Sequence, residues 1–220
     1  MAPRCKEYLW DGKPDAEVFT IQEALYDVDF WNGADYELIC YMESGHQFHK
    51  YLTYNSGFRL HASALKWNEK AFLFSAPCGT GKSTHGKMWQ QLYGEDAVTV
   101  INDDKPSMRL LDGKWYAYGT PWCGKDGINQ NIKVPVAGIC FLEQGPENRI
   151  RRMEPAECIG RMMDQTIWQW LNQEEMNLLL DSMDKLIRRI PIYLLECTPT
   201  TDAAKLSSET MLQGAIDAGL

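Results

Sequence analysis

The sequence predicts an α/β domain with a mixed β-sheet, preceded by a small N-terminal lobe that is rich in β-structure. Three observations carry this prediction. Short apolar runs typical of buried strands recur along the chain, and helix-like segments stand between or after them. Two of the strand-like segments are joined by Asp112-Gly113-Lys114, a turn typical of an antiparallel hairpin. Because a purely parallel sheet contains no such hairpin, these signals favour a mixed sheet over an all-parallel one.

Residues 1–60 are irregular and rich in aromatic side chains, and we expect them to form the N-terminal lobe. Their clearest strand-like segment is "YELICYM" at residues 36–42, since aromatic and branched side chains are frequent in strands. Residues 61–220 then form the main domain. Near its start, "FRLHASAL" and "AFLFSA" flank the polar segment "KWNEK", which predicts a hairpin or two adjacent strands.

Helix and strand signals follow one another through the rest of the main domain. Residues 83–93 are helix-like, and the next residue, Gly94, is typical of a helix C-cap. Residues 97–101, "AVTVI", have the composition of a buried strand. The later elements expected are the strand "VPVAGICFLE" ending at Glu143, helices over residues 155–170 and 173–189, the strand "IYLLEC", and a helix from about Asp202.

Composition and charge narrow the classes of function. Hydrophobic residues make up 45% of the chain and charged residues 24%, which is typical of a globular protein. The net charge of −8 argues against nucleic acid as a partner, because an acidic surface repels phosphate backbones. No apolar run approaches the roughly 18 residues of a membrane helix, and the N-terminus lacks the apolar segment of a secretory signal. Membrane partners are therefore not expected.

Seven scattered cysteines, none of them in a C-x-x-C pair, favour a reducing compartment. We therefore expect a cytoplasmic protein, and a homo-oligomer is compatible with the sequence.

A phosphate-binding motif follows the second strand of the predicted hairpin. Residues 76–83, "APCGTGKS", match G-x-x-x-x-G-K-[ST] except that Ala76 stands in the first glycine position. The glycines allow a tight turn that aims backbone N–H groups at an anion, the lysine brings a cation to the phosphates, and Ser83 offers a hydroxyl to Mg²⁺. A strand before the motif and a positive helix end after it complete the context of a nucleotide site. The alternative is a glycine turn that only caps the helix.

We accordingly expect ATP and Mg²⁺ as cofactors. The candidate nucleotide-binding residues are Pro77, Cys78, Gly79, Thr80, Gly81, Lys82, Ser83 and Thr84.

Asp103 and Asp104 follow the apolar strand and are the candidate acidic groups of the site. Adjacent side chains at a strand end diverge, so one carboxylate can organise Mg²⁺ while the other faces an acceptor hydroxyl. The alternative is an Asx turn into Lys105-Pro106. His61, on a neighbouring strand, is a candidate partner of these carboxylates, and a buried core histidine is the alternative.

The loop over residues 119–131, "GTPWCGKDGINQN", is long and polar, as functional loops often are. Lys125 is a candidate to balance the charge of the γ-phosphate, and Asn129 or Asn131 is a candidate to bind the acceptor. The alternative is a polar surface loop with glycine turns.

Taken together, His61, the segment "CGTGKST", the segment "VINDD" and the late strand "IPIYLLEC" resemble the C-terminal catalytic domain of HPr kinase/phosphorylase and its HprK-like kinase relatives. That group shares its nucleotide-binding core with ATP-dependent phosphoenolpyruvate carboxykinase. The resemblance implies a P-loop domain of this type, with Lys82 and the loop glycines on the phosphates and Ser83 on Mg²⁺. It also implies that Asp103 and Asp104 supply the metal-organising group and the general base, with His61 near that base.

The sequence departs from the classical enzyme in two places. Residues 1–60 do not look like its regulatory domain, and the segment after "NDD" differs from the one implicated in the phosphorylase reaction. The chain looks more like the short stand-alone HprK-like kinases, including those found with peptide-modification systems.

The resulting hypothesis is a kinase that transfers the γ-phosphate of ATP to a Ser or Thr hydroxyl of a peptide or protein. Its candidate catalytic residues are Asp103, Asp104, Lys82, His61 and Lys125, and its candidate metal ligands are Ser83, Asp103 and Asp104. A small-molecule kinase that acts on a free hydroxyl metabolite would use the same residues. A non-catalytic ATP-dependent switch is the third hypothesis, and the double Asp argues against it.

Overall fold

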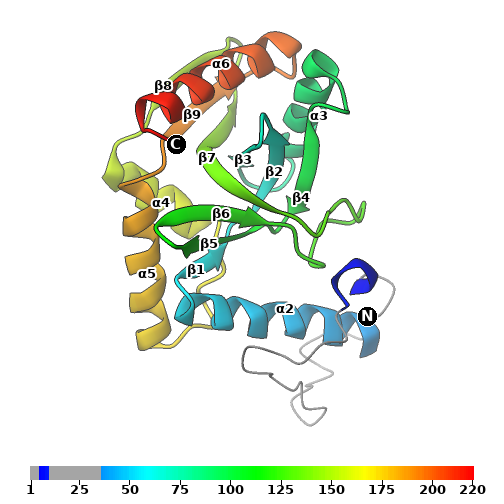
Figure 1. The fold of residues 1–220 in the computed structure, drawn as a ribbon, viewed down its shortest axis with the longest axis vertical. Coiled ribbons are helices and arrows are strands. Elements are labelled where there is room, and N and C mark those ends of the chain that lie inside the picture. The colour runs from blue at the N-terminus through cyan, green and yellow to red at the C-terminus, as the bar shows by residue number, and fades with distance from the viewer. Residues whose placement is uncertain (1–4, 10–35) are drawn as a thin grey trace.

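The computed structural model describes residues 5–9 and 36–220, and Figure 1 shows their arrangement. In this part of the chain, nine strands form one mixed sheet in the order β1-β5-β6-β7-β3-β2-β4, with β9 on β7 and β8 on β9. The strands are β1 (Gly57–Arg59), β2 (Ala62–Trp67), β3 (Lys70–Ser75), β4 (Thr99–Asp104), β5 (Ser107–Leu111), β6 (Lys114–Tyr118), β7 (Lys133–Gln144), β8 (Arg149–Arg152) and β9 (Ile192–Cys197). The helices are η1 (Lys6–Tyr8), α2 (Tyr36–Tyr54), α3 (Lys82–Tyr93), α4 (Pro155–Asp164), α5 (Gln173–Ile187) and α6 (Thr201–Asp217).

The predicted α/β class with a mixed sheet is confirmed. Strand β3 pairs in parallel with β7, and β7 in parallel with β9, whereas the remaining strand pairs are antiparallel. The two predicted hairpins are present as β2–β3 and β5–β6. Strand β7 is long enough to join both halves of the sheet, because its first residues pair with β6 and its later residues with β9.

Helices cover the two faces of the sheet and give it two apolar cores. On one face, α3 and α6 contribute side chains such as Trp89 and Met211 to a core over β3, β7 and β9. On the other face, α4 and α5 contribute Met162 and Met183 to a core that extends to β1, β5 and β6. Figure 1 shows α3 and α6 together at one end of the view and α2 at the other, with the sheet between them.

The strand expected over residues 36–42 is wrong, because this segment begins helix α2. Within seven residues the aromatic and branched side chains resemble a strand. Over the whole helix, however, the buried residues Tyr41, Gly45, His49 and Leu52 recur every three or four positions, which is the helical period. Packing over several turns thus outweighs the local preference.

The described residues of the predicted lobe are therefore mainly helical rather than β-rich. Their one strand, β1, pairs with β5 of the main sheet. The rest of the predicted lobe, residues 1–4 and 10–35, lies outside the described residues, and the domain division at residue 60 stays a prediction.

The helix expected over residues 155–170 ends earlier, at Asp164. The following segment is held by partners outside α4: the backbone N–H of His61 donates to the carbonyl of Gln165 at 2.8 Å, and His49 Nε2 lies 2.7 Å from the carbonyl oxygen of Ile167. Helix α5 then begins after Asn172, whose side chain forms a capping box with Glu175. Within the described ranges, no helix is both long and apolar enough to cross a membrane.

The helix that follows the phosphate-binding motif is fixed to α6 by a buried polar cluster. His85 Nε2 lies 3.0 Å from Ser207 Oγ, and Trp89 Nε1 donates to both of these groups. Burial lowers the pKa of His85 to about 4. The histidine is therefore neutral at physiological pH and its protonation opposes folding.

We predict that His85→Gln flattens the acid dependence of stability. Since the pKa of His85 lies near 4 in the fold and near 6.5 in an unfolded chain, the unfolded state binds more protons between these values. The stabilisation due to neutral His85 is complete above about pH 6.5 and is lost as the pH falls toward 4, by roughly 3 kcal/mol at most. Urea unfolding at a series of pH values measures the free energy of unfolding of wild type and variant. If this free energy depended on pH with the same slope in both proteins, the prediction would be wrong.

Candidate functional site

The loop over residues 76–81 leaves β3 and turns into α3 through two glycines with positive φ. Gly79 has φ 80° and Gly81, the N-cap residue of α3, has φ 117°. A Cβ atom built on either residue would meet nothing within 4 Å. Glycine is therefore required by the backbone conformation and not by lack of space, and the turn leaves an open concave side.

Ala76, the departure from the common motif, faces away from this concave side. Its side chain is 2% exposed and belongs to the apolar core under α3 and α6. Its carbonyl oxygen accepts a hydrogen bond from Lys82 Nζ at 2.9 Å, and the carbonyl of Pro77 accepts another at 3.3 Å. The extra methyl group is therefore compatible with an intact phosphate loop.

Lys82 is held inside the loop as a nearly buried cation. Burial lowers its pKa, and the nearby carboxylates of Asp104 and Asp103, the former more strongly, oppose this effect. Since its two hydrogen-bond partners are neutral carbonyls of its own loop, its charge is not matched by a direct ion pair among the described residues. An anionic ligand in the loop would supply the missing counter-charge.

Asp104 is fixed by two basic side chains. His61 Nε2 lies 3.2 Å from Asp104 Oδ1, and Lys105 Nζ lies 2.7 Å from Asp104 Oδ2. Burial raises the pKa of Asp104, but the hydrogen bonds from His61 and Lys105 outweigh it and hold this pKa well below its ordinary value. The carboxylate is thus ionised throughout the physiological range.

His61 is oriented from its other side by Gln165. His61 Nδ1 lies 3.0 Å from Gln165 Oε1, and the backbone N–H of His61 donates to the Gln165 carbonyl. The imidazole is therefore held between the segment after α4 and the end of β4, with Nε2 directed at Asp104.

Asp103 differs from its neighbour in its surroundings. Its side chain forms no ion pair in the described part of the chain, whereas its backbone is tied to the loop after β6. The N–H of Asp103 donates to Ile128 at 3.0 Å, and its carbonyl accepts from Gly124 at 2.7 Å. Asp103 is thus a fixed carboxylate whose oxygen atoms are open to a ligand.

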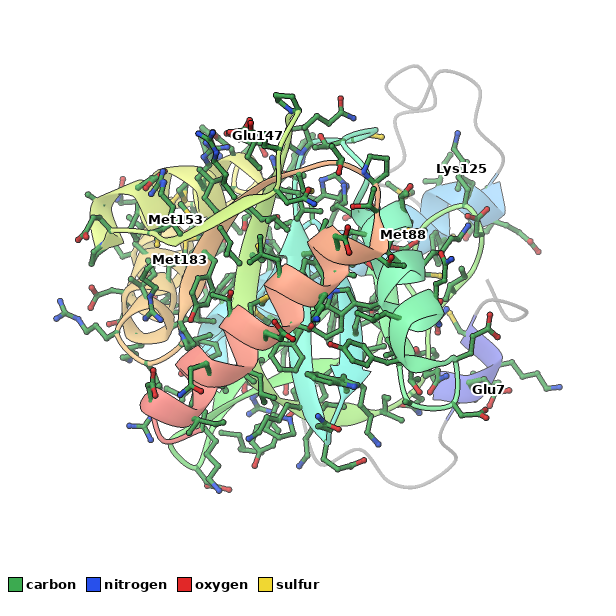
Figure 2. All side chains as sticks on the ribbon, turned by 90° about the horizontal axis from the view of Figure 1, so that it is seen from above. Glu7, Met88, Lys125, Glu147, Met153 and Met183 are labelled. Atoms are coloured by element: carbon green, nitrogen blue, oxygen red, sulfur yellow. The ribbon has the colours of Figure 1, made fainter. Side chains whose placement is uncertain are left out.

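These groups line one cavity of about 520 Å³. It brings together residues that lie up to 67 positions apart, namely His61, Cys78, Gly79, Gly81, Lys82, Ser83, Thr84, Asp103, Asp104, Gly124, Lys125, Asp126 and Ile128. Of the residues proposed from sequence, Pro77 and Thr80 belong to the loop without lining the cavity. Lys125 lines its rim, and Figure 2 shows its side chain directed away from the body of the molecule.

The loop over residues 119–131 supplies further lining residues that the sequence did not single out, including Gly124, Asp126 and Ile128. Asn129 and Asn131, the candidate acceptor-binding residues, instead hold the N-terminal segment. Asn129 Oδ1 accepts from Tyr8 at 2.5 Å, and Asn131 Nδ2 donates to the carbonyl of Glu7 at 2.7 Å. The glycines of this loop are a signal in the sequence that could have identified it as part of the site. Its hydrogen bonds with the backbone of Asp103, in contrast, join segments distant in the sequence and could not be predicted from local sequence.

The backbone of Asp104 is strained. Its φ of 123° lies in a region that residues with a side chain rarely adopt. Such strain costs about 1–3 kcal/mol and persists only where the surroundings impose it. Here the ion pairs with His61 and Lys105 supply the constraint.

We predict an inverted order of stability at this position. Asp104→Gly should be more stable than Asp104→Ala by about 1–3 kcal/mol, because both variants lose the carboxylate but only glycine relieves the strain. At Asp103 the order should be the ordinary one, with Asp103→Ala more stable than Asp103→Gly by roughly 0.5–1 kcal/mol. Chemical denaturation of the four variants measures both differences, and the same order at both positions would contradict the prediction.

Comparison with known proteins gives one matching family and 24 matching chains of solved structures. The family model described as "ScmC: SynChlorMet cassette protein ScmC" matches residues 26–202. The structure of the Hpr(Ser) kinase/phosphatase from Coxiella burnetii is similar with a TM-score of 0.39 and 14% sequence identity, over 70% of this chain and 88% of that chain. At this TM-score the likeness carries no conclusion about this chain. No curated protein matches it. Beyond the α/β class, the resemblance indicated by the motifs stays a prediction.

Proposed function

We propose that this chain, which belongs to the SynChlorMet cassette protein ScmC family, is an ATP-dependent kinase that phosphorylates a hydroxyl group of a peptide or protein. One observation carries the proposal: a single cavity contains a glycine loop with positive φ, a lysine inside that loop, a helix N-terminus and two carboxylates. These are the groups that phosphoryl transfer needs for positioning and for charge neutralisation.

The residues of the loop fit the triphosphate of ATP. The N–H groups around Gly79–Ser83 and the positive end of α3 bind phosphate oxygens, while Lys82 exchanges its carbonyl partners for the β- and γ-phosphates. No group of three or more His, Cys, Asp and Glu residues forms a metal site in the described ranges. Mg²⁺ does not require one, because it retains waters and binds phosphate oxygens, so Ser83 and Asp103 suffice as protein partners.

The two aspartates then divide their tasks. Asp103 lines the phosphate-loop cavity and not the second cavity beside it, whereas Asp104 and His61 line both. We therefore assign Asp103 to the metal and phosphate side and Asp104 to the acceptor hydroxyl. Because the transition state of phosphoryl transfer is loose, the base needs mainly to be ionised and positioned, and both conditions hold for Asp104.

In the proposed transfer step, every bond formed or broken and the proton released are accounted for by ATP, the acceptor hydroxyl and Asp104. The acceptor oxygen forms a bond to the γ-phosphorus while the bond from this phosphorus to the β,γ-bridging oxygen breaks, and ADP leaves with that bonding pair. The hydroxyl proton passes to Asp104, whose partner His61 holds the carboxylate in place.

A peptide or protein acceptor is favoured by the segment after α4, part of which lines the second cavity together with Asp104. The segment after α4 exposes two large aromatic side chains, Trp168 at 39% and Trp170 at 51% exposure. Tryptophan is enriched where proteins bind other chains, because it buries a large area with little loss of conformational entropy. The family's description as a cassette protein agrees with this choice.

Two other hypotheses remain to be tested against it. A small-molecule kinase would use the same catalytic groups, and the acceptor distinguishes the two. A non-catalytic switch would bind ATP without transfer. The proposal includes a cytoplasmic location, which supplies ATP and a reducing environment for seven free cysteines.

We predict that Lys82→Ala loses at least about tenfold in affinity for ATP–Mg²⁺, because the variant lacks the buried cation of the loop. Isothermal titration calorimetry measures the change. Lys125→Ala is the matched control, since this exposed lysine lies at the rim and should alter ATP affinity less. Equal affinities of wild type and Lys82→Ala would remove the nucleotide site.

We further predict that Asp103→Asn and Asp104→Asn each slow phosphoryl transfer by about a hundredfold or more, the usual scale for losing a catalytic proton acceptor or a metal-organising group. The isosteric amides keep the size of each side chain, so much of the ATP affinity should remain. Single-turnover transfer of labelled γ-phosphate to a peptide library, analysed by mass spectrometry, provides the measurement. Unchanged rates in both variants would make the kinase assignment wrong even if ATP still binds.

A further inference from the structure

The second cavity, of about 370 Å³, adjoins the proposed catalytic carboxylate and contains a buried arginine. Asp104 and His61 line both cavities, so they form the boundary between them. The remaining lining comes from Arg59, Leu60, Lys105, Asp164, Gln165, Thr166, Ile167 and Gln169. A ligand in this second cavity therefore lies directly beside the group assigned to the acceptor hydroxyl.

Arg59 is 6% exposed, yet it forms no ion pair in the described part of the chain. Burial lowers the pKa of Arg59 to about 10, and the charge of Asp104 opposes this effect from a distance. The guanidinium is consequently charged at neutral pH. A buried charge without a direct partner is costly, which makes this residue unusual for a purely structural arginine.

One edge of the Arg59 guanidinium contacts the protein, and the other edge forms no hydrogen bond with the described residues. Nη1 donates to the carbonyl of Gly45, and the group lies over the ring of Trp122 at 5.8 Å from its centroid. A Cβ atom on Gly45 would stand 2.9 Å from Trp122 Cδ1 and 3.1 Å from Arg59 Nη1, so glycine at this position makes room for both side chains. These contacts fix the plane of the guanidinium.

The other edge of the Arg59 guanidinium is formed by Nε and Nη2. No hydrogen bond among the described residues uses either atom, and Nε is buried without a partner. Thr166 Oγ1, also in the lining of this cavity, is a second buried polar atom without a partner. Buried donors are rarely left unpaired, so two of them at one cavity indicate a polar ligand.

We propose that this cavity binds a carboxylate group of the phosphate acceptor, held by the Nε–Nη2 edge of Arg59 and by Thr166. The inference rests on the proposed kinase function and names a chemical class for its substrate. A guanidinium edge matches the two oxygens of a carboxylate in a bidentate pair. A dianionic phosphate fits less well, because Asp104 lies in the same cavity and Asp164 stands at its rim.

The carboxylate can come from two sources. One is a peptide, through its C-terminus or an acidic side chain, and the other is a free hydroxy acid. In either case its distance from the hydroxyl has to be short, since Arg59 and Asp104 line the same small cavity. Lys105 adds a second cation beside the carboxylate, although its ammonium group is engaged by Asp104.

The experiment observes Arg59 directly and does not depend on turnover. The Nε–H of a buried arginine gives its own signal in a proton–nitrogen correlation spectrum, and Arg59→Lys assigns it. The probes are glycolate and an acetylated dipeptide with a C-terminal serine, each compared with its amide. We expect each active carboxylate probe to shift the Arg59 signal in a saturable manner and its amide to bind at least about tenfold more weakly.

Two variants give independent readings. Arg59→Lys keeps the charge and loses the fork, so the carboxylate probe that is active should bind about tenfold more weakly while ATP affinity, measured by calorimetry, is unchanged. Thr166→Val keeps the shape and removes the hydroxyl, and it should weaken the same probe by several-fold.

The outcomes separate this inference from the function on which it rests. A response to the dipeptide alone supports the inference with a peptide as the source, and a response to glycolate alone supports it with a free hydroxy acid. Equal responses to acid and amide, or no response to either acid while ATP binds through Lys82, would overturn the inference and leave the kinase intact. A response of Arg59 in a protein that does not bind ATP would support the carboxylate site and overturn the kinase.

Discussion

The register between β2 and β4 is the constraint on which the rest of the site depends. Ala62 pairs with Asp104 and Ser63 with Asp103, so His61, one residue before β2, lies beside the end of β4. Side chains alternate across a sheet, and a slip by one residue would exchange the faces of both aspartates. A register shift between Ala64 and Leu65 sets this alignment, since Ala64 pairs with Asn102 while Leu65 pairs with Val100. The irregularity therefore decides which carboxylate meets the histidine.

The same sheet places the phosphate loop at the same edge. Because β3 and β7 are parallel, their carboxyl ends lie together, which is where α/β sheets commonly bind ligands. Gln144, the last residue of β7, donates to the carbonyl of Thr80 at 3.2 Å and ties the loop to this edge. On the other side, α3 is anchored to α6 through His85 and Ser207. The loop over residues 76–81 is thus supported by rigid elements on both sides, as a preformed anion site requires.

Elements that depend on short stretches of sequence could be predicted, whereas contacts between segments distant in the sequence could not. The strand expected over residues 97–101, the glycine loop and helix α3 follow from local composition and spacing, and the structure contains all three, although β4 runs from Thr99 to Asp104 and so includes both aspartates. Helix α2 was missed because a seven-residue window resembles a strand, whereas its buried stripe needs several turns to become visible. The helix expected from residue 173 does begin there as α5, where Asn172 and Glu175 form a capping box.

Arg59 and Gln165 gave no sign of their roles for a different reason. Each is an ordinary residue in its local segment, and each acquires its position only when β1, α2 and the segment after α4 pack together. The positive φ of Asp104 lies in a turn that is closed locally, because Asn102 Oδ1 accepts from the N–H of Lys105 at 2.8 Å, and His61 adds a tertiary contact. Local sequence therefore identifies the residues of the proposed phosphate side, while the proposed acceptor side is created by folding.

The two cavities are electrostatically coupled through the group that they share. Asp104 is held ionised by His61 and Lys105, and its charge in turn favours the buried cation of Arg59. A carboxylate bound at Arg59 neutralises that cation and places a second negative charge beside Asp104. Like charges at short distance raise the pKa of a carboxyl group. If the proposed acceptor binds there, the proton affinity of Asp104 consequently rises, so in the proposed reaction the binding of the acceptor itself would make Asp104 a stronger base.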